Sequence, residues 1–400
     1  MTHDAGFLSR SCCVHNTVGK LSHGVVASDE SRLQNMNRVA HISPRFLRAM
    51  VCNKDTVRAF ATVRTVAELR NVRNRALRRD QSVGFVPTMG ALHEGHLALI
   101  RQAARENDHV YVSIYVNPTQ FGVNEDLSSY PRTWPSDSTK LRQLDGELMQ
   151  DRNTGQLSTV FMPSTEEMYP GLPPTSEIDG QGSFVTITPL SSRLEGASRP
   201  VFFRGVATVV MKLLNIVQPE KVYFGQKDIQ QTFIVRRMVK DFHLNTDVRV
   251  GPTVREKDGL AMSSRNVYLG QRRRKVALVL LNSLKEVQRV YARGAKKRRY
   301  FYNAAMELLS LVQKQQEALP KSERARFEID YISIADPNTL DELEEVTPQD
   351  GAIVSGAIKM LPLEAWREGE ILGEGEDAGP VRLIDNTRLD LVSAKVGFIP

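Results

Sequence analysis

The sequence predicts an α/β fold, with a doubly wound parallel sheet followed by a smaller C-terminal α+β domain. Two observations lead to this prediction. Strand-like and helix-like segments alternate between residues 63 and 250, and such alternation is typical of a parallel sheet that is covered by helices on both faces. After Gly251-Pro252 the pattern changes to long basic helices followed by strands, so we expect a domain boundary there.

The alternating part, residues 61–252, divides into two series of elements. The first series holds an amphipathic helix at 63–79, a buried strand at 83–87, a helix at 97–105 and a β-prone run at 110–116. The second holds a helix at 203–217, a strand at 221–224, a helix at 230–242 and a strand at 246–250. We expect the polar residues 150–158, between the two series, to form a surface insertion.

The smaller domain, residues 253–400, is expected to hold two long helices and three strands. The helices lie at about 271–292 and 302–318, and the strands at 327–334, 352–359 and 381–385. An acidic, glycine-rich segment at residues 369–379 (GEILGEGEDAG) is the second expected surface insertion.

Residues 1–60 are expected to form a poorly ordered extension, because they show no sustained apolar period. The extension is basic, and it has no Asp or Glu between Ser31 and Lys54. This composition is compatible with a mitochondrial transit peptide or with the dispensable tail of a cytoplasmic protein. All three cysteines lie in this stretch, which favours a reducing compartment such as the cytoplasm.

The overall composition excludes several classes of protein. Hydrophobic residues make up 41% of the chain and charged residues 25%, which excludes collagen-like and wholly disordered chains. No apolar run approaches the roughly 18 residues of a membrane span. The formal charge of 53 − 46 = +7 is spread along the chain. We therefore interpret the basic runs at 272–275 (RRRK) and 296–299 (KKRR) as solvated helix faces and not as a nucleic-acid site.

The most informative motif lies between the first predicted strand and the helix after it, at residues 87–96 (PTMGALHEGH). The N-terminus of a helix offers backbone N–H groups and a positive dipole end, so it is an anion-binding site. Gly90 and Gly95 allow close approach of a phosphate or purine. His93 and His96, three residues apart, share one helix face and can donate hydrogen bonds to phosphate oxygens.

Other interpretations of this histidine pair stay open. A His-x-x-His pair is also compatible with ordinary capping histidines, or with a zinc site, although no third zinc ligand is evident. The chain has neither the P-loop pattern nor a G-x-G-x-x-G after a strand. The strand–loop–helix context therefore favours a nucleotide-binding domain of another type.

Two more clusters follow predicted strands. FGQKDIQQ at residues 224–231 includes Lys227, which could neutralise phosphate, and Gln231, which could bind a hydroxyl or carboxylate group. DGLAMSSRN at residues 258–266 offers the hydroxyls of Ser263 and Ser264 and the guanidinium of Arg265, a set suited to polyphosphate. Each cluster alone could also be a solvated polar loop.

Taken together, seven ordered motifs resemble the pantothenate synthetase (pantoate–β-alanine ligase) family of the HIGH-type nucleotidyltransferase superfamily. They cover roughly residues 61–390 and read PTMGALHEGH, VNPTQFGVNEDLSSYPRT, LEGASRP, FRGVATVVMKL, FGQKDIQQ, VREKDGLAMSSRN and RLIDN. His-x-Gly-His stands for the family's HIGH signature, and Met-Ser-Ser-Arg stands where related enzymes carry Lys-Met-Ser-Lys-Ser.

The resemblance implies a two-step ligase reaction in pantothenate biosynthesis, on the coenzyme A pathway. Pantoate attacks the α-phosphorus of ATP to give pantoyl adenylate and pyrophosphate, and β-alanine then displaces AMP to form an amide. Mg²⁺ is expected to arrive with ATP and to be held mainly by its phosphates. No metal site in the protein, no nucleic acid and no membrane partner are expected, and relatives are homodimers.

The resemblance also assigns roles to residues. His96 stands at the family's proton-donor position, and His93, Lys227, Ser263, Ser264 and Arg265 complete the predicted catalytic set. Gln120 and Gln231 are expected to bind pantoate or β-alanine. The predicted ATP-binding residues are Met89, Gly90, Ala91, Leu92, His93, Glu94, Gly95, His96, Gly225, Gln226, Lys227, Asp228, Val254, Met262, Ser263, Ser264 and Arg265.

Two departures from the family pattern bear on function. One is the insertion at 369–379, which lies in the smaller domain, and the resemblance implies that this domain closes over the active site as a lid. The other lies at residue 202. The family usually reads Arg-Pro-x-His-Phe-Arg-Gly, whereas this chain has Phe202 in place of the histidine. Phenylalanine cannot donate a hydrogen bond, so one alternative is a catalytically weakened nucleotide-binding protein of the same fold. Another alternative is an adenylyltransferase that acts on a different acceptor.

Overall fold

The fold is seen in a computed structural model that describes residues 60–122, 127–151, 153–171, 181–374 and 379–390. The predicted N-terminal extension, residues 1–60, lies outside the described residues except for Phe60. Part of the predicted insertion at 369–379 also lies outside them, because residues 375–378 are not described.

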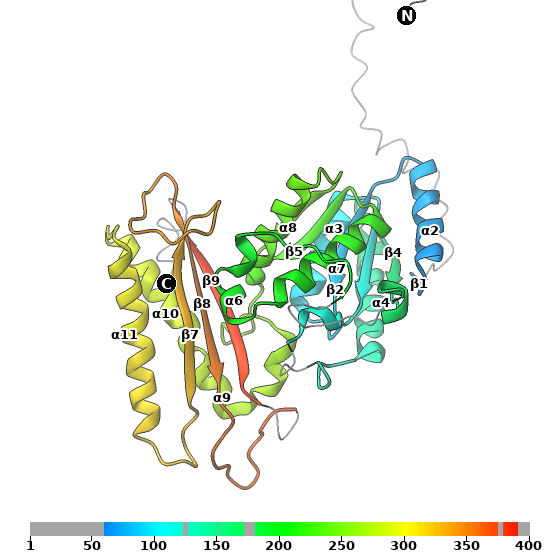
Figure 1. Cartoon of the computed structure of the whole chain (residues 1–400). Coiled ribbons are helices and arrows are strands. Elements are labelled where there is room, and N and C mark those ends of the chain that lie inside the picture. Colours follow the sequence, from blue (N-terminus) through cyan, green and yellow to red (C-terminus); the bar gives the residue numbers. More distant parts are fainter. Residues whose placement is uncertain (1–59, 123–126, 152, 172–180, 375–378, 391–400) are drawn as a thin grey trace, which may run out of the picture. The chain divides into compact units, whose positions relative to one another are not determined.

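A parallel sheet of six strands lies at the centre of the larger part of the described chain (Figure 1). Its strands are β1 (Ala61–Val63), β2 (Val83–Thr88), β3 (His109–Ile114), β4 (Gln156–Phe161), β5 (Lys221–Gly225) and β6 (Asp247–Gly251). Their order across the sheet is β1-β4-β3-β2-β5-β6, and every neighbouring pair is parallel. The chain thus builds outward from β2 in one direction and then returns to add β5 and β6 on the other side.

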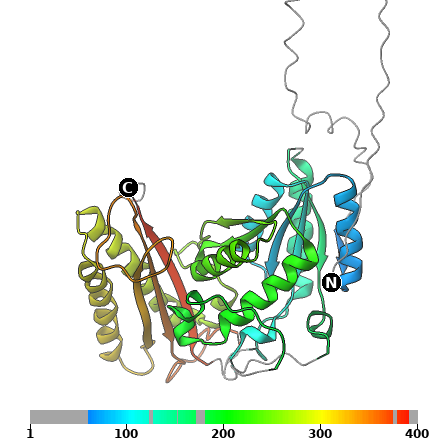
Figure 2. The same cartoon turned by 45° about the horizontal axis from the view of Figure 1, so that its top comes forward.

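Helices cover both faces of this sheet (Figure 2). On one face, Phe85 and Val222 belong to a core that includes α2 (Val66–Arg78), α7 (Phe202–Val217) and α8 (Ile229–Asp241). On the other face, Val86 and Val112 pack with α3 (Glu94–Glu106) and α4 (Trp134–Gln150). The strands are therefore buried on both sides, which is why they read as continuous apolar runs in the sequence.

The predicted surface insertion at residues 150–158 is wrong at its C-terminal end. Residues from Gln156 onward form β4, which lies between β1 and β3 in the sheet. The polar side chains of Ser158 and Thr159 hid this strand, although Thr159 is fully buried. The three-residue strand β1 and the helix α4 were not predicted either.

The first helix begins three residues later than predicted. Thr65 is its N-cap, and Thr65 and Glu68 form a reciprocal capping box in which each side chain accepts a hydrogen bond from the other residue's backbone N–H. Short helices fill the connections: α5 (Thr165–Met168), α6 (Glu195–Ser198), and the 3₁₀ turns η1 (Pro118–Gln120), η2 (Leu190–Ser192), η3 (Gln226–Asp228) and η4 (Ser264–Tyr268).

The C-terminal part holds an antiparallel three-stranded sheet with the order β7-β8-β9. Its strands are β7 (Phe327–Ala335), β8 (Ala352–Met360) and β9 (Val381–Leu389), and its helices are α9 (Gly270–Ala277), α10 (Val279–Ala292) and α11 (Arg298–Glu317). The helix predicted at 271–292 is thus divided at Leu278. Helices α10 and α11 pack against the sheet (Figure 1) and share its core.

The basic run at 272–275 is not the solvated face that we predicted. Arg272 pairs with Glu370 of the insertion, and Arg274 pairs with Glu256 and Asp258. Arg273 is buried and donates to the backbone carbonyls of the preceding turn. Three of the four cations are therefore bound within the chain.

The described part of the 369–379 insertion is anchored to residues 267–271. The backbone N–H of Gln271 donates to the carbonyl of Ile371 at 3.0 Å, and that of Glu374 donates to the carbonyl of Val267 at 2.9 Å. This anchor follows the Ser263–Arg265 segment directly in the sequence. Within the described residues, no helix combines the length and the apolar character that a membrane crossing requires.

We predict that Gly270→Ala destabilises the protein more than Gly294→Ala. Both glycines have positive φ angles, 58° and 91°. A Cβ at Gly270 would lie 2.4 Å from the backbone of Leu372, whereas a Cβ at Gly294 meets nothing within 4 Å. Gly270→Ala should lower the free energy of unfolding by about 2–4 kcal/mol and Gly294→Ala by about 1 kcal/mol, measured by denaturant titration. Equal losses would show that the insertion does not pack as described.

Candidate functional site

The candidate site lies where the carboxyl ends of β2 and β5 meet. These neighbouring strands mark the point at which the order of the sheet reverses, and ligands of open α/β sheets bind at such points. A cavity of about 190 Å³ opens there. It is lined by ten predicted site residues: Met89, His93, His96, Gln120, Lys227, Asp228, Gln231, Ser263, Ser264 and Arg265.

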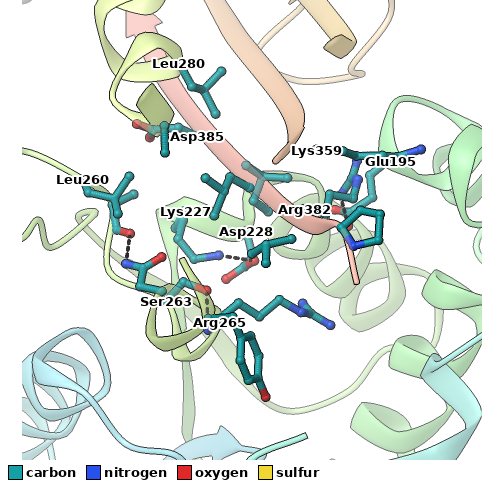
Figure 3. Close-up of a pocket in the computed structure, with 18 of the residues that line it drawn as sticks. Glu195, Lys227, Asp228, Leu260, Ser263, Arg265, Leu280, Lys359, Arg382 and Asp385 are labelled. Carbon is teal, nitrogen blue, oxygen red and sulfur yellow. Dashed lines mark hydrogen bonds and ion pairs between the residues drawn. The ribbon is translucent and has the colours of Figure 1, made fainter. Parts of the chain in front are cut away.

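A second, larger cavity of about 850 Å³ shares several of these residues. Lys227, Asp228, Ser263 and Arg265 line both cavities. In Figure 3 these side chains lie below the β9 strand, which contributes further lining residues such as Asp385. The two cavities thus adjoin along the predicted phosphate-binding side chains.

The loop between β2 and α3 is held by a buried carboxylate. Asp137, which is fully buried at the start of α4, accepts hydrogen bonds from the backbone N–H groups of Ala91 and Leu92 at 3.0 and 2.8 Å. Gly90 and Ala91 both have positive φ angles, 88° and 48°. A Cβ at Gly90 would approach Asp137 to 3.3 Å, so glycine suits this tight turn.

His93 and His96 cap the start of α3 reciprocally. The Nδ1 of His93 accepts a hydrogen bond from the backbone N–H of Gly95 at 3.2 Å, and the Nδ1 of His96 accepts one from the backbone N–H of His93 at 3.4 Å. The two ring centroids lie 4.1 Å apart. A Cβ at Gly95 would lie 2.9 Å from the His93 ring, so this ring position requires glycine at residue 95.

Burial determines the charge of the two rings, and the capping determines their tautomer. Burial, reinforced by the charge of Lys227, lowers the pKa of His93 to about 4. Burial and the neighbouring His93 lower the pKa of His96 well below its usual range. In a neutral imidazole one nitrogen accepts and the other donates. Since both Nδ1 atoms accept backbone hydrogen bonds, both Nε2 atoms carry the proton.

The cationic and hydroxyl side chains come from two turns. Lys227 lies on η3, directly after β5, and its Nζ donates to the Oδ1 of Asp228 at 3.0 Å. Ser263 caps η4 by accepting a hydrogen bond from the backbone N–H of Arg265 at 3.3 Å. The hydroxyl of Ser264 lies 3.2 Å from that of Tyr130. Tyr130 also lines the smaller cavity.

The amide of Gln120 is oriented by a short chain of hydrogen bonds. Tyr169 donates from its hydroxyl to the Oδ1 of Asn117 at 2.7 Å, and the Nδ2 of Asn117 donates to the Oε1 of Gln120 at 3.1 Å. The Nε2 of Gln120 is directed toward the Sδ of Met89, a cavity residue, at 3.2 Å. Gln120 therefore presents hydrogen-bond donors to the cavity, and acceptors such as carboxylate or hydroxyl oxygens suit it.

Nine predicted ATP-binding residues, all within the described part of the chain, line neither cavity: Gly90, Ala91, Leu92, Glu94, Gly95, Gly225, Gln226, Val254 and Met262. Their surroundings differ. Leu92 is buried in the core, Glu94 pairs with Arg101 at the surface, and Gln226 bonds to Asn386.

Sequence reasoning missed the residues that hold these groups in place, namely Asp137, Asn117 and Tyr169. Asn117 lies inside the motif VNPTQFGVNEDLSSYPRT and Asp137 lies shortly after it. Nothing in the sequence around either residue indicated that it holds a loop or an amide in place.

Phe202 lies between the two cavities at the start of α7. The guanidinium of Arg199 lies over the Phe202 ring, 3.7 Å from its centroid, which is a cation–π contact. Arg199 also pairs with Glu195 at 2.9 Å. The aromatic ring that replaces the expected histidine is therefore packed against a lining cation.

Comparison with known proteins identifies the family of this chain. A family model described as pantoate-beta-alanine ligase matches residues 61–388. The chain belongs to the pantoate–β-alanine ligase family. It is 43% identical over 328 residues to the pantothenate synthetase of Roseiflexus castenholzii, an alignment that covers 82% of this chain and 100% of the relative. It is 45% identical over 312 residues to that of Chloroflexus aurantiacus, which covers 78% and 98%.

Solved structures of this family share the fold. The pantothenate synthetase of Thermus thermophilus matches with a TM-score of 0.63 and 40% identity, covering 82% of this chain and 99% of that one. The pantoate-beta-alanine ligase of Francisella tularensis matches with a TM-score of 0.56 and 29% identity, covering 85% and 99%, and was solved in complex with beta-gamma ATP and beta-alanine. The parallel sheet and the smaller C-terminal sheet are thus those of a ligase family that forms an amide bond.

We predict that His93→Asn makes the stability of the protein less dependent on pH. Because the folded-state pKa of His93 is about 4 against 6.5 for the ordinary group, the unfolded state binds more protons between these values. The contribution of neutral His93 to the free energy of unfolding is complete above pH 6.5, and it is lost as the pH falls toward 4. Asparagine keeps the cap on Gly95 but does not titrate.

The measurement is the free energy of unfolding at several pH values between 4 and 7. The decline of the wild type over this range should exceed that of His93→Asn by about 1–3 kcal/mol. Parallel curves for the two proteins would contradict a low pKa at His93.

Proposed function

We propose that this protein condenses pantoate with β-alanine in an ATP-dependent reaction that passes through a pantoyl adenylate. Pyrophosphate leaves in the first step and AMP in the second, and the product is pantothenate. The observation that carries the proposal is the convergence of neutral His93 and His96, Lys227 and the Ser263–Arg265 turn on one cavity at the β2–β5 edge. The family membership and the ATP complex of the Francisella relative support the same reaction.

In the first step the pantoate carboxylate attacks the α-phosphorus, and the bond to the pyrophosphate leaving group breaks. A carboxylate is already ionised, so this step requires orientation and charge stabilisation and no general base. The Nε2–H groups of His93 and His96 donate to phosphate oxygens as negative charge develops on them. Lys227 and Arg265, which line the same cavity, add positive charge.

In the second step the neutral amine of β-alanine attacks the acyl carbon of the adenylate, the bond to the AMP oxygen breaks, and the nitrogen loses a proton to solvent as the amide forms. His96 can donate a hydrogen bond through Nε2 to the departing phosphate. Gln120 and Gln231 are proposed to hold the hydroxyl and carboxylate groups of pantoate. A site that binds polar groups in this way strongly rejects analogues that lack them.

Mg²⁺ is proposed to enter with ATP. The described residues contain no group of three or more His, Cys, Asp or Glu side chains that could hold a metal ion. A Mg²⁺ ion held mainly by phosphate oxygens and water needs no such group, and it would neutralise charge on the leaving pyrophosphate.

We also propose that the protein is a homodimer and that it is cytoplasmic. Sedimentation analysis would test the first proposal and cell fractionation the second.

The direct test is AMP formation by the purified protein from ATP and pantoate, with and without β-alanine. Pantoate-dependent exchange of labelled pyrophosphate into ATP, and AMP release that requires β-alanine, are the expected results. Binding of ATP without any AMP would instead favour a weakened nucleotide-binding protein. Exchange that occurs only with another acid would exclude pantoate as the substrate.

We predict that His96→Ala lowers the turnover number at least about 100-fold, because one oxyanion-type donor is removed from the transition state. Steady-state AMP release measures this effect. His109→Ala is the control: His109 is another partly buried histidine, which bonds to Ser158 away from the cavities. Near-normal AMP release by the His96 variant would contradict its proposed role.

We predict that Phe202→His does not lower the turnover number and can raise it. Histidine keeps a flat ring under the Arg199 guanidinium and adds a hydrogen-bond donor beside both cavities. Phe202→Ala, which removes the ring, is the comparison and should lower activity through loss of this packing. A marked loss of activity in Phe202→His would show that the cavity has become adapted to the apolar ring.

A further inference from the structure

The RLIDN segment of β9 carries two polar residues that the proposed reaction does not use. Asp385 and Asn386 are only 4% and 3% exposed, although both are polar. They are adjacent on a strand of the C-terminal sheet, yet each is bonded to a different loop of the site. We propose that Asp385 and Asn386 are positioning residues, which hold the Lys227 turn and the Ser263–Arg265 turn in place for the phosphates of ATP. This inference rests on the proposed function.

Asn386 binds the backbone of the η3 turn. Its Nδ2 donates to the carbonyl of Gln226 at 2.9 Å and to that of Lys227 at 3.0 Å. Its Oδ1 accepts a hydrogen bond from the Gln226 side chain at 3.3 Å. One side chain thus uses both amide N–H groups on the two carbonyls that precede Asp228. This contact fixes the place from which the Lys227 ammonium reaches the cavity.

Asp385 binds the hairpin that leads to Ser263. Its carboxylate accepts two hydrogen bonds from the guanidinium of Arg255, at 2.7 and 3.0 Å, and one from the backbone N–H of Asn386 at 2.8 Å. Such paired contacts to a carboxylate are strong and directional. Asp385, Leu260, Lys227 and Ser263 all line the larger cavity, and Figure 3 labels each of them.

Arg255 lies at the base of a narrow hairpin. It forms an antiparallel bridge with Ala261, and the backbone N–H of Met262 donates to the carbonyl of Val254 at 3.0 Å. The Arg255 guanidinium also donates to the carbonyl of Gly259 at 3.2 Å. Since Ser263 follows this hairpin directly, the Asp385–Arg255 pair sets where the second turn begins.

The arrangement explains how one strand of the smaller sheet can control both groups of phosphate-binding side chains. Successive residues of a strand point to opposite faces. Neighbouring positions can therefore reach different partners. Here the partners are the η3 turn, which follows β5 of the larger sheet, and the hairpin at 254–262. A shift of either turn by about 1 Å would misplace a charged group, and such shifts cost about 100-fold in rate.

The test uses Asn386→Leu in the full-length protein. Leucine keeps the shape of asparagine but has no N–H groups to donate to Gln226 and Lys227. Thr387→Val is the matched control on the same strand, because it removes a hydrogen bond to Gln288 on α10 and leaves both turns untouched. Both variants should be checked for folding by thermal unfolding, and Asn386→Asp serves in place of the leucine variant if that variant does not fold.

We expect Asn386→Leu to lower the turnover number by about 10- to 100-fold and to weaken ATP binding, with Thr387→Val within about twofold of the wild type. A purely structural role predicts the same loss in every background. A positioning role predicts that Asn386→Leu causes almost no further loss of turnover when Lys227 is already alanine, because no ammonium group is then left to position. Asp385→Asn should show this coupling with Arg265→Ala and not with Lys227→Ala.

Two results would overturn the inference. One is an Asn386→Leu protein with turnover and ATP affinity like those of Thr387→Val, and the other is a loss that is fully additive with Lys227→Ala. Absence of AMP formation by the wild type would instead refute the proposed function. ATP affinity, measured by calorimetry for the same variants, would then still decide whether Asn386 positions Lys227.

Discussion

The reciprocal hydrogen bonding of His93 and His96 with the first turn of α3 is the constraint on which the rest of the site depends. Each Nδ1 accepts a hydrogen bond from a backbone N–H, so Nε2–H is the donor that each neutral ring keeps. Gly95 makes this contact sterically feasible, and burial keeps both rings uncharged at neutral pH. The donors offered at this helix end therefore include imidazole N–H groups, because the backbone N–H groups of His93 and Gly95 are already bonded.

The smaller sheet contributes to the site through polar contacts. Asn386 reaches the η3 turn of the larger part and Asp385 reaches the hairpin at 254–262, while Arg382 pairs with Glu195 of α6 and with Asp330 of β7. Arg382 and Asp330 are largely buried, and buried charges require partners on every side. The two sheets are thus joined along the same cavities that hold the phosphate-binding side chains, so β9 belongs functionally to the site.

The basic run at 272–275, which the sequence suggested to be a solvated surface, is mostly bound within the chain. The arginines of α9 bind the insertion and the hairpin at 254–262, and the Arg199 guanidinium lies on the Phe202 ring. A mildly basic chain therefore does not present its basic run at 272–275 as a surface for polyanions, because three of its four cations are already bound within the chain.

The sequence by itself determined the alternating α/β pattern, the strand–loop–helix setting of His93 and His96, and the place of Lys227 after a strand. These features depend on residues within a few positions of one another. Only the tertiary structure decided that Asp137 holds the Ala91 loop, that Asn386 binds the Lys227 turn 159 residues away, and that β4 lies inside the sheet. Periodicity reports which face of an element is buried, but the order of strands in a sheet decides which distant side chains meet.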